Sequence, residues 1–156
     1  LSSKSIFFFP MKVKEFIGKD GSAAIESAIK EAELNTSGEI RVHIESECKV
    51  QNPVDRAIFI FNHLKMFETK DRNGVLIYVA VKSKKFAIIG DCGINEAVPA
   101  NFWDDIKDKM RASFVNGEYI NGLTHAIKEA GISLKQFFPY QSDDVNEQPD
   151  EISFGE

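Results

Sequence analysis

Three short polar segments carry oxygen atoms that could hold a cation, and each lies at one end of an expected β-strand. They are Thr36-Ser37-Gly38-Glu39, Lys70-Asp71-Arg72-Asn73-Gly74 and Gly90-Asp91-Cys92-Gly93-Ile94-Asn95-Glu96. If the first two strands run parallel and the third runs back, all three segments meet at one rim of the sheet. Carboxylate and carbonyl oxygens are the ligands that hard cations prefer. We therefore predict a divalent-cation site, with calcium as the expected ion, formed by Glu39, Asp71, Asp91 and Glu96.

Two other interpretations of this acidic rim stay open. In the first, Asp71 and Arg72 make surface pairs and the other polar residues form turns, so that the chain is a metal-independent protein-interaction domain. In the second, a bound cation activates water and Asp91 acts as base or nucleophile of a phosphatase. The sequence has no Gly-x-Ser-x-Gly motif and no phosphate-binding glycine loop, which makes an enzyme the less favoured interpretation.

Composition excludes several classes of function. The chain has 156 residues and is 43% hydrophobic, which suits one domain with a single core. Its net charge of −5 is unfavourable for binding nucleic acid, because phosphate recognition requires a dense basic face. No apolar run approaches the length of about 20 residues that a membrane span requires. We expect a cytoplasmic monomer that acts through an unknown protein partner.

The histidines and cysteines give no sign of a metal or redox site. His43, His63 and His125 lack a second His or Cys at ligand spacing, so we expect them to be structural or solvated. Cys48 follows the first expected strand and Cys92 follows the third, which runs the opposite way. Because this topology separates the two sulfur atoms by the length of a strand, we predict two free thiols.

The expected elements follow from hydrophobic periodicity. A helix capped by Asp20 ends before Gly38, and alternation from Ile40 to Ile44 predicts a strand near an edge of the sheet, with one buried and one wetter face. Asn52-Pro53 begins a helix that extends to about Phe67, and its wide apolar stripe indicates deep burial. The apolar run of residues 74–81 predicts a central strand, and a short turn returns residues 86–89 antiparallel.

Helical periodicity resumes from Pro99 and again after Gly117. Helices before, between and after the strands can cover both faces of the sheet, so the predicted fold is a three-layer α/β/α sandwich with a small mixed β-sheet. We divide the chain into an N-terminal extension (residues 1–15), one domain (16–138) and an acidic C-terminal tail (139–156). The tail is expected to be irregular.

Four of these motifs resemble the TPM domain family. They are Thr-Ser-Gly-Glu-Ile-Arg-Val at 36–42, Arg-Asn-Gly-Val-Leu-Ile at 72–77, Ile-Ile-Gly-Asp-Cys-Gly-Ile-Asn at 88–95 and Phe102-Trp103. The resemblance extends from about Phe16 to Pro139. It implies an α/β/α sandwich, frequent calcium binding and, in some members, acid phosphatase activity. Roles differ among members, so the resemblance alone does not fix a function.

Overall fold

The computed structural model describes residues 12–141 and 146–155. The N-terminal extension up to residue 11 and residues 142–145 of the tail lie outside the described residues. No helix in the described ranges is long and apolar enough to cross a membrane. The elements in chain order are α1 (Val13–Ile17), α2 (Gly21–Ala32), β1 (Glu39–Glu45), α3 (Pro53–His63), β2 (Gly74–Ala80), β3 (Lys85–Gly90), α4 (Cys92–Ala97), α5 (Asp104–Val115), α6 (Tyr119–Leu134) and β4 (Ser153–Phe154).

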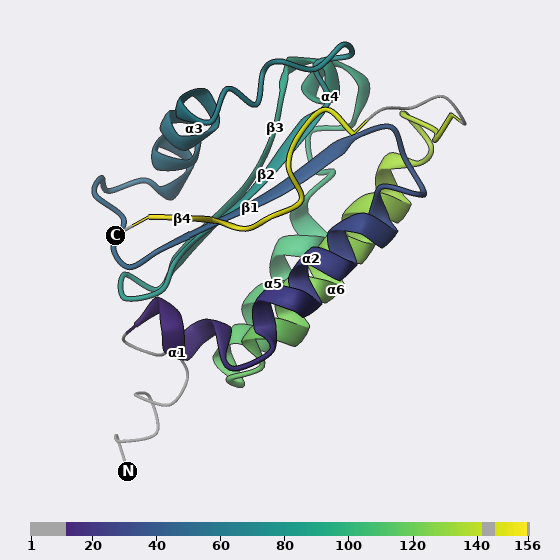
Figure 1. Ribbon diagram of the computed structural model, residues 1–156. Helices are drawn as coiled ribbons and strands as arrows, with labels where there is room; N and C mark the ends of the chain where they lie inside the picture. The colour runs from purple at the N-terminus through teal and green to yellow at the C-terminus, as the bar shows by residue number, and fades with distance from the viewer. Residues whose placement is uncertain (1–11, 142–145, 156) are drawn as a thin grey trace.

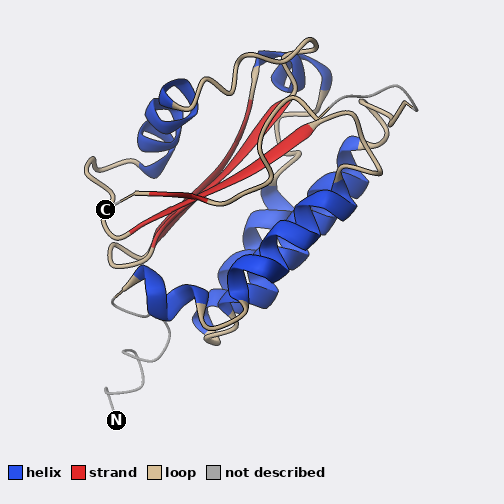
Figure 2. Ribbon diagram, in the orientation of Figure 1, coloured by secondary structure: helices blue, strands red, loops and turns tan. Residues whose placement is uncertain are grey.

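The strands form one mixed sheet in the order β3-β2-β1-β4 (Figure 1). β1 and β2 are parallel, with Glu39 opposite Gly74, whereas β3 returns antiparallel to β2. The predicted strand directions are therefore confirmed. Figure 2 shows helices on both sides of these strands, as expected for an α/β/α sandwich.

The two helical layers are unequal. α2, α5 and α6 cover one face of the sheet (Figure 1), where the larger hydrophobic cluster includes Ile40 and Val42 of β1. α3 covers the other face over a smaller cluster centred on Leu76 and Tyr78. Alternate residues of β1 therefore face different layers.

Helix α3 is shorter and less buried than its sequence predicts. Its start is as expected: Asn52 accepts a hydrogen bond from the Val54 N–H at 2.9 Å. It ends at His63 rather than near Phe67, since Lys65 adopts a left-handed φ of 55° that a helix cannot continue through. Ile58 and Phe59 are 47% and 57% exposed, because a single helix can turn only part of a wide apolar stripe toward the sheet.

The structure contains two short elements that hydrophobic periodicity does not predict. Cys92–Ala97 forms helix α4, capped by Asp91. Ser153–Phe154 of the C-terminal tail forms β4, which pairs in parallel with His43 and Ile44 of β1. In the described residues 146–155 of the tail, Gln148 and Ile152 are buried, so this part is not a solvated acidic segment. Hydrophobic periodicity could not predict β4, because a two-residue strand is too short to show a repeat.

Both cysteines are free, as the predicted topology requires. Cys48 is half-buried between α3 and the end of β1, and its thiol donates to the carbonyl of Val50 at 3.1 Å. Cys92 is exposed at the first turn of α4. The fold is therefore held by packing and hydrogen bonds rather than by a disulfide.

Candidate functional site

The three polar segments do meet at the amino ends of β1 and β2. The Glu39 N–H donates to the carbonyl of Asn73 at 3.2 Å, and the Asp91 N–H donates to the carbonyl of Gly74 at 2.9 Å. Backbone hydrogen bonds thus join all three segments into one rim. The rim predicted from strand direction is present, but its acidic side chains have different surroundings.

Asp91 is engaged by Arg72 and by the start of α4. Its carboxylate receives the Nε and Nη2 groups of Arg72 at 2.7 and 2.9 Å, and it accepts the Cys92 N–H at 2.7 Å. A bidentate guanidinium contact satisfies a carboxylate strongly and neutralises its charge. Asp91 therefore has a structural role, in which it joins the loop before β2 to the start of α4. These contacts do not favour a role as a free base or nucleophile.

Asp71 and Glu96 are exposed, one in the loop before β2 and the other on α4. Among the described residues, no group of three or more His, Cys, Asp or Glu side chains converges as a metal site. The four acids predicted from the sequence consequently share a rim without forming a common first coordination sphere in this structure.

Glu39 lies in a more unusual environment than the other rim acids. Its buried carboxylate accepts the backbone N–H groups of Glu147 and Gln148 at 3.0 and 2.9 Å. Burial raises the pKa of Glu39 to about 7, although these two N–H donors act in the opposite direction. The carboxylates of Glu147 and Asp150 add repulsion that raises it further. Glu39 can therefore hold a proton near neutral pH.

Glu33, just beyond the end of α2, is a second perturbed acid that sequence analysis missed. Its Oε2 accepts the Ile40 N–H at 3.0 Å, and it lines the same cavity as Asp150. Burial, and after it the nearby Asp150, raises the pKa of Glu33 to about 9. No local motif could have revealed this pair, because Asp150 arrives from the C-terminal tail.

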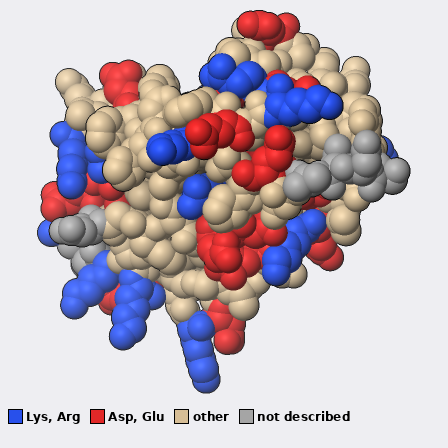
Figure 3. All heavy atoms as spheres, turned by 45° about the horizontal axis from the view of Figure 1, so that its top comes forward, with Lys and Arg blue, Asp and Glu red and all other residues tan. Residues whose placement is uncertain are grey.

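These acids line a cavity of about 210 Å³, here called the carboxylate pocket. Its polar walls include Lys30, Ser37 and Asn146 besides the three acids, Glu33, Glu39 and Asp150. Figure 3 turns the top of Figure 1 toward the viewer and shows Asp and Glu side chains gathered on this face. Beside the pocket, Asn73 donates from Nδ2 to Ser37 at 3.4 Å, while its buried Oδ1 has no partner among the described residues.

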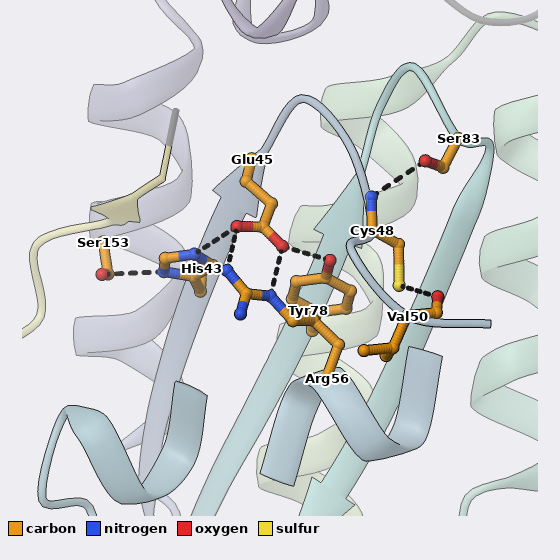
Figure 4. Close-up of polar contacts among 8 residues, drawn as sticks. All are labelled: His43, Glu45, Cys48, Val50, Arg56, Tyr78, Ser83 and Ser153. Atoms are coloured by element: carbon orange, nitrogen blue, oxygen red, sulfur yellow. Dashed lines mark hydrogen bonds and ion pairs between the residues drawn. The ribbon is translucent and has the colours of Figure 1, made fainter. Parts of the chain in front are cut away.

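A separate polar network lies under α3 on the opposite half of β1 (Figure 4). Glu45 receives Nε and Nη2 of Arg56 at 2.8 and 2.9 Å and also accepts the hydroxyl of Tyr78. His43 Nδ1 lies 2.9 Å from Ser153 Oγ, and His43 Nε2 lies 3.6 Å from Glu45 Oε1. His43 and Glu45 are both buried, which corrects the expectation that this face of β1 is wetter.

The charges in this network are compensated. Burial would raise the pKa of Glu45, but the hydrogen bonds from Arg56 and Tyr78 outweigh it, so the pKa is lowered. Burial lowers the pKa of His43 despite the nearby Glu45, which keeps the imidazole neutral at pH 7. The network anchors α3 and β4 to β1.

Known proteins similar to this chain were found by family and by structure. The family model for the TPM domain matches residues 12–131. The chain is also similar to the NMR structure of the BA42 protein from the psychrophilic bacterium Bizionia argentinensis, with 46% identity and a TM-score of 0.85. That similarity covers 92% of this chain and 99% of the other. No curated protein matches. The family match includes Glu33 and Glu39 but ends before the C-terminal segment that supplies Asp150.

Proposed function

We propose that this chain, which belongs to the TPM domain family, binds a divalent cation in the carboxylate pocket at the amino end of β1. The observation that carries the proposal is the gathering of Glu33, Glu39 and Asp150 around one cavity. Burial, and to a smaller extent the neighbouring acids, raises the pKa of Glu33 to about 9 and that of Glu39 to about 7. A divalent cation would supply the missing positive charge and displace the protons.

The donor set suits a hard cation. Carboxylate, amide and hydroxyl oxygens surround the cavity, and calcium tolerates such irregular oxygen shells. The unpartnered Oδ1 of Asn73 lies next to this wall through the contact of its amide with Ser37. Glu33, Glu39 and Asp150 line the cavity, but they do not come close enough together to hold an ion by themselves, so we expect the ion to retain several water ligands. The ammonium of Lys30 lines the same cavity, and the cation would compete with it.

The proposed ligand set keeps Glu39 from the sequence-based prediction. It replaces the other three residues with Glu33 and Asp150, because Asp91 is already neutralised by Arg72 and the remaining two acids are exposed. A contribution from Asp71, Asp91 or Glu96 stays a prediction. The variants described next separate the two sets.

Calcium titration by calorimetry should detect this binding together with release of protons. At pH 7 we expect binding heats that differ between buffers of different ionisation enthalpy, because the ion displaces about one proton from the pocket. Glu39→Gln should weaken the affinity about tenfold or more, a loss of about 1.4 kcal/mol or more. It should leave the fold intact, since the glutamine Oε1 can still accept the Glu147 and Gln148 N–H groups.

The matched control is Glu96→Gln, which removes an exposed acid from the same rim. It should leave the affinity unchanged. Heats absent at millimolar calcium would contradict the proposal, and equal affinity in Glu39→Gln would move the site away from the pocket. Loss of binding in Glu96→Gln instead would favour the set predicted from the sequence.

A metal-independent protein-interaction role is the second candidate. Ile58 and Phe59 project from α3 with about half of their surface exposed, as the figures of 47% and 57% show. Exposed apolar side chains on a surface helix can mark a contact surface. Thermal unfolding that does not respond to calcium would favour this candidate, because a ligand selective for the folded state must raise its apparent stability.

A further inference from the structure

The polar network between β1 and β4 places a serine hydroxyl, an imidazole and a carboxylate next to one another (Figure 4). His43 and Glu45 are two residues apart on β1, so their side chains share the face of the sheet that carries α3. Ser153 is opposite His43 in the parallel register of β4 and β1, which brings it to the same face. Its Oγ lies 2.9 Å from His43 Nδ1, and His43 Nε2 lies 3.6 Å from Glu45 Oε1. The imidazole therefore lies between the hydroxyl and the carboxylate.

Glu45 determines which nitrogen of His43 carries the proton. Burial would raise the pKa of the Glu45 carboxyl group, but the hydrogen bonds from Arg56 and Tyr78 outweigh it and keep the group ionised. The proton of the neutral imidazole is then most favourable on Nε2, which faces this negative charge, and Nδ1 is left as an acceptor. The Ser153 hydroxyl consequently donates to Nδ1. In this arrangement a histidine can remove the proton of an attacking serine.

These three groups line a cavity of about 440 Å³, here called the β4 pocket. Helix α3 packs on β2 and β3, and the adjoining part of the sheet, over β1 and β4, forms the floor of the pocket. The walls combine apolar surface from Leu64 and Phe154 with the cationic groups of Lys49 and Arg56. Ser153 is half-buried rather than enclosed, so a small molecule in the pocket can reach its hydroxyl.

We propose that Ser153 is the nucleophile and His43 the general base of an acyl-transfer site in the β4 pocket, with small carboxylic esters as the class of substrate. Glu45 is a positioning residue, which acts on the reaction through His43. The order of nucleophile, base and carboxylate is that of the Ser-His-Asp triad, although the two ring nitrogens exchange their roles. This activity does not rest on the proposed cation site, which lies at the opposite end of β1.

The proposed hydrolysis proceeds in two acyl-transfer steps. In the first, Ser153 Oγ bonds to the carbonyl carbon of the ester while its proton moves to His43 Nδ1. The bond from that carbon to the alkoxide then breaks, and the alkoxide takes the proton from Nδ1, which leaves the acyl group on Oγ. In the second step, water adds to the acyl carbon and its proton passes to Nδ1. The bond to Oγ breaks as Ser153 regains the proton, and positive charge from Lys49 and Arg56 stabilises the oxyanion in both steps.

The surroundings of His43 keep it available as a base at neutral pH. Burial lowers the pKa of the imidazole below its ordinary value of 6.5, and the attraction of Glu45 acts against this shift. The guanidinium groups of Arg56 on α3 and Arg41 on β1 add to the lowering. The pocket is also lined by Lys49 and His63. Acylation should therefore have a constant rate at neutral and higher pH, and this rate should fall as pH decreases through the lowered pKa of His43.

Labelling with a fluorophosphonate provides the test, because this reagent phosphonylates a serine whose hydroxyl is activated by a neighbouring base. The full chain at neutral pH should gain a single phosphonyl group, which mass spectrometry of the digested protein should locate on Ser153. Ser153→Ala should gain none and should remain folded by circular dichroism, since the half-buried hydroxyl makes one hydrogen bond. His43→Gln should lower the labelling rate about 100-fold or more. Hydrolysis of 4-nitrophenyl acetate should be lost in Ser153→Ala.

Ser46→Ala is the matched control, because Ser46 is also half-buried and lies directly after β1. It should be labelled and should hydrolyse the ester like the parent chain. A parent chain that takes up no label at millimolar reagent, or that takes it up at a residue other than Ser153, would overturn the proposal. Equal ester hydrolysis by the parent and Ser153→Ala would do the same. A labelling rate that keeps rising with pH above neutrality would overturn the assignment of His43 as the base.

Discussion

Arg56→Ala should lower the free energy of unfolding by about 3 kcal/mol, because it leaves the buried Glu45 carboxylate without its guanidinium partner. Glu45 is 1% exposed, and two of its bonds come from Arg56 (Figure 4). Removing one member of such a pair costs more than the pair itself contributes, since the remaining charge stays buried. Urea unfolding followed by circular dichroism measures the change.

The same variant should change how the free energy of unfolding depends on pH below neutrality. The lowered pKa of Glu45 means that its contribution is present at neutral pH and is lost as pH falls through that pKa. In Arg56→Ala the free energy of unfolding should decrease less as pH falls, because ionisation of the Glu45 carboxyl group no longer stabilises the folded state. Asp55→Ala, at an exposed position of the same helix, is the control and should change stability by less than about 0.5 kcal/mol. If Arg56→Ala lowers the free energy of unfolding by less than about 1 kcal/mol, the folded state does not depend on the Arg56–Glu45 ion pair.

Gly93→Ala should destabilise the chain by about 2–3 kcal/mol by forcing α4 away from the loop before β2. A Cβ atom at Gly93 would lie 2.2 Å from the Asp71 carbonyl oxygen and 2.6 Å from that of Arg72. Both are backbone atoms, so a side-chain rotation cannot relieve the overlap. The shift should also disturb the Gly93 N–H bond to Arg72 and the adjacent Arg72–Asp91 ion pair.

Chemical denaturation of Gly93→Ala beside Glu96→Ala checks this prediction. Glu96 is exposed on the same short helix, and its replacement should cost less than about 0.5 kcal/mol. Equal stability of the two variants would mean that the close approach of Gly93 to the loop is not required. If folded Gly93→Ala protein still binds calcium, the part of the rim formed by Arg72, Asp91 and α4 does not contribute to the cation site in the carboxylate pocket.

The sheet could be predicted because its signals are local. The apolar run of residues 74–81 and the short turn before residue 86 determine a buried strand and its antiparallel return. Parallel pairing of β1 with β2 follows from the intervening helix α3. These directions place Glu39 and Asp91 at one end of the sheet, so the rim was predicted correctly.

The surroundings of the rim acids could not be predicted because they depend on distant partners. Alternation in β1 indicated a polar face containing His43 and Glu45, but only tertiary structure brings Arg56 and Ser153 to cover it. Likewise, the helical pattern shows Glu33 as one more acid near a helix end. Glu33 and Asp150 share a cavity only because the C-terminal segment returns to β1, and the sequence offers only a two-residue strand to indicate that return.

Manganese relaxation is the most direct test of the carboxylate pocket, because this paramagnetic ion occupies oxygen-rich divalent sites and broadens nearby NMR signals. Substoichiometric manganese should broaden the amide signals of Ser37, Glu39 and Gln148 first, and excess calcium should restore them. Glu39→Gln should weaken this broadening. Broadening centred on Asp91 and Glu96, or no selective broadening in the described chain, would contradict a cation site at the carboxylate pocket.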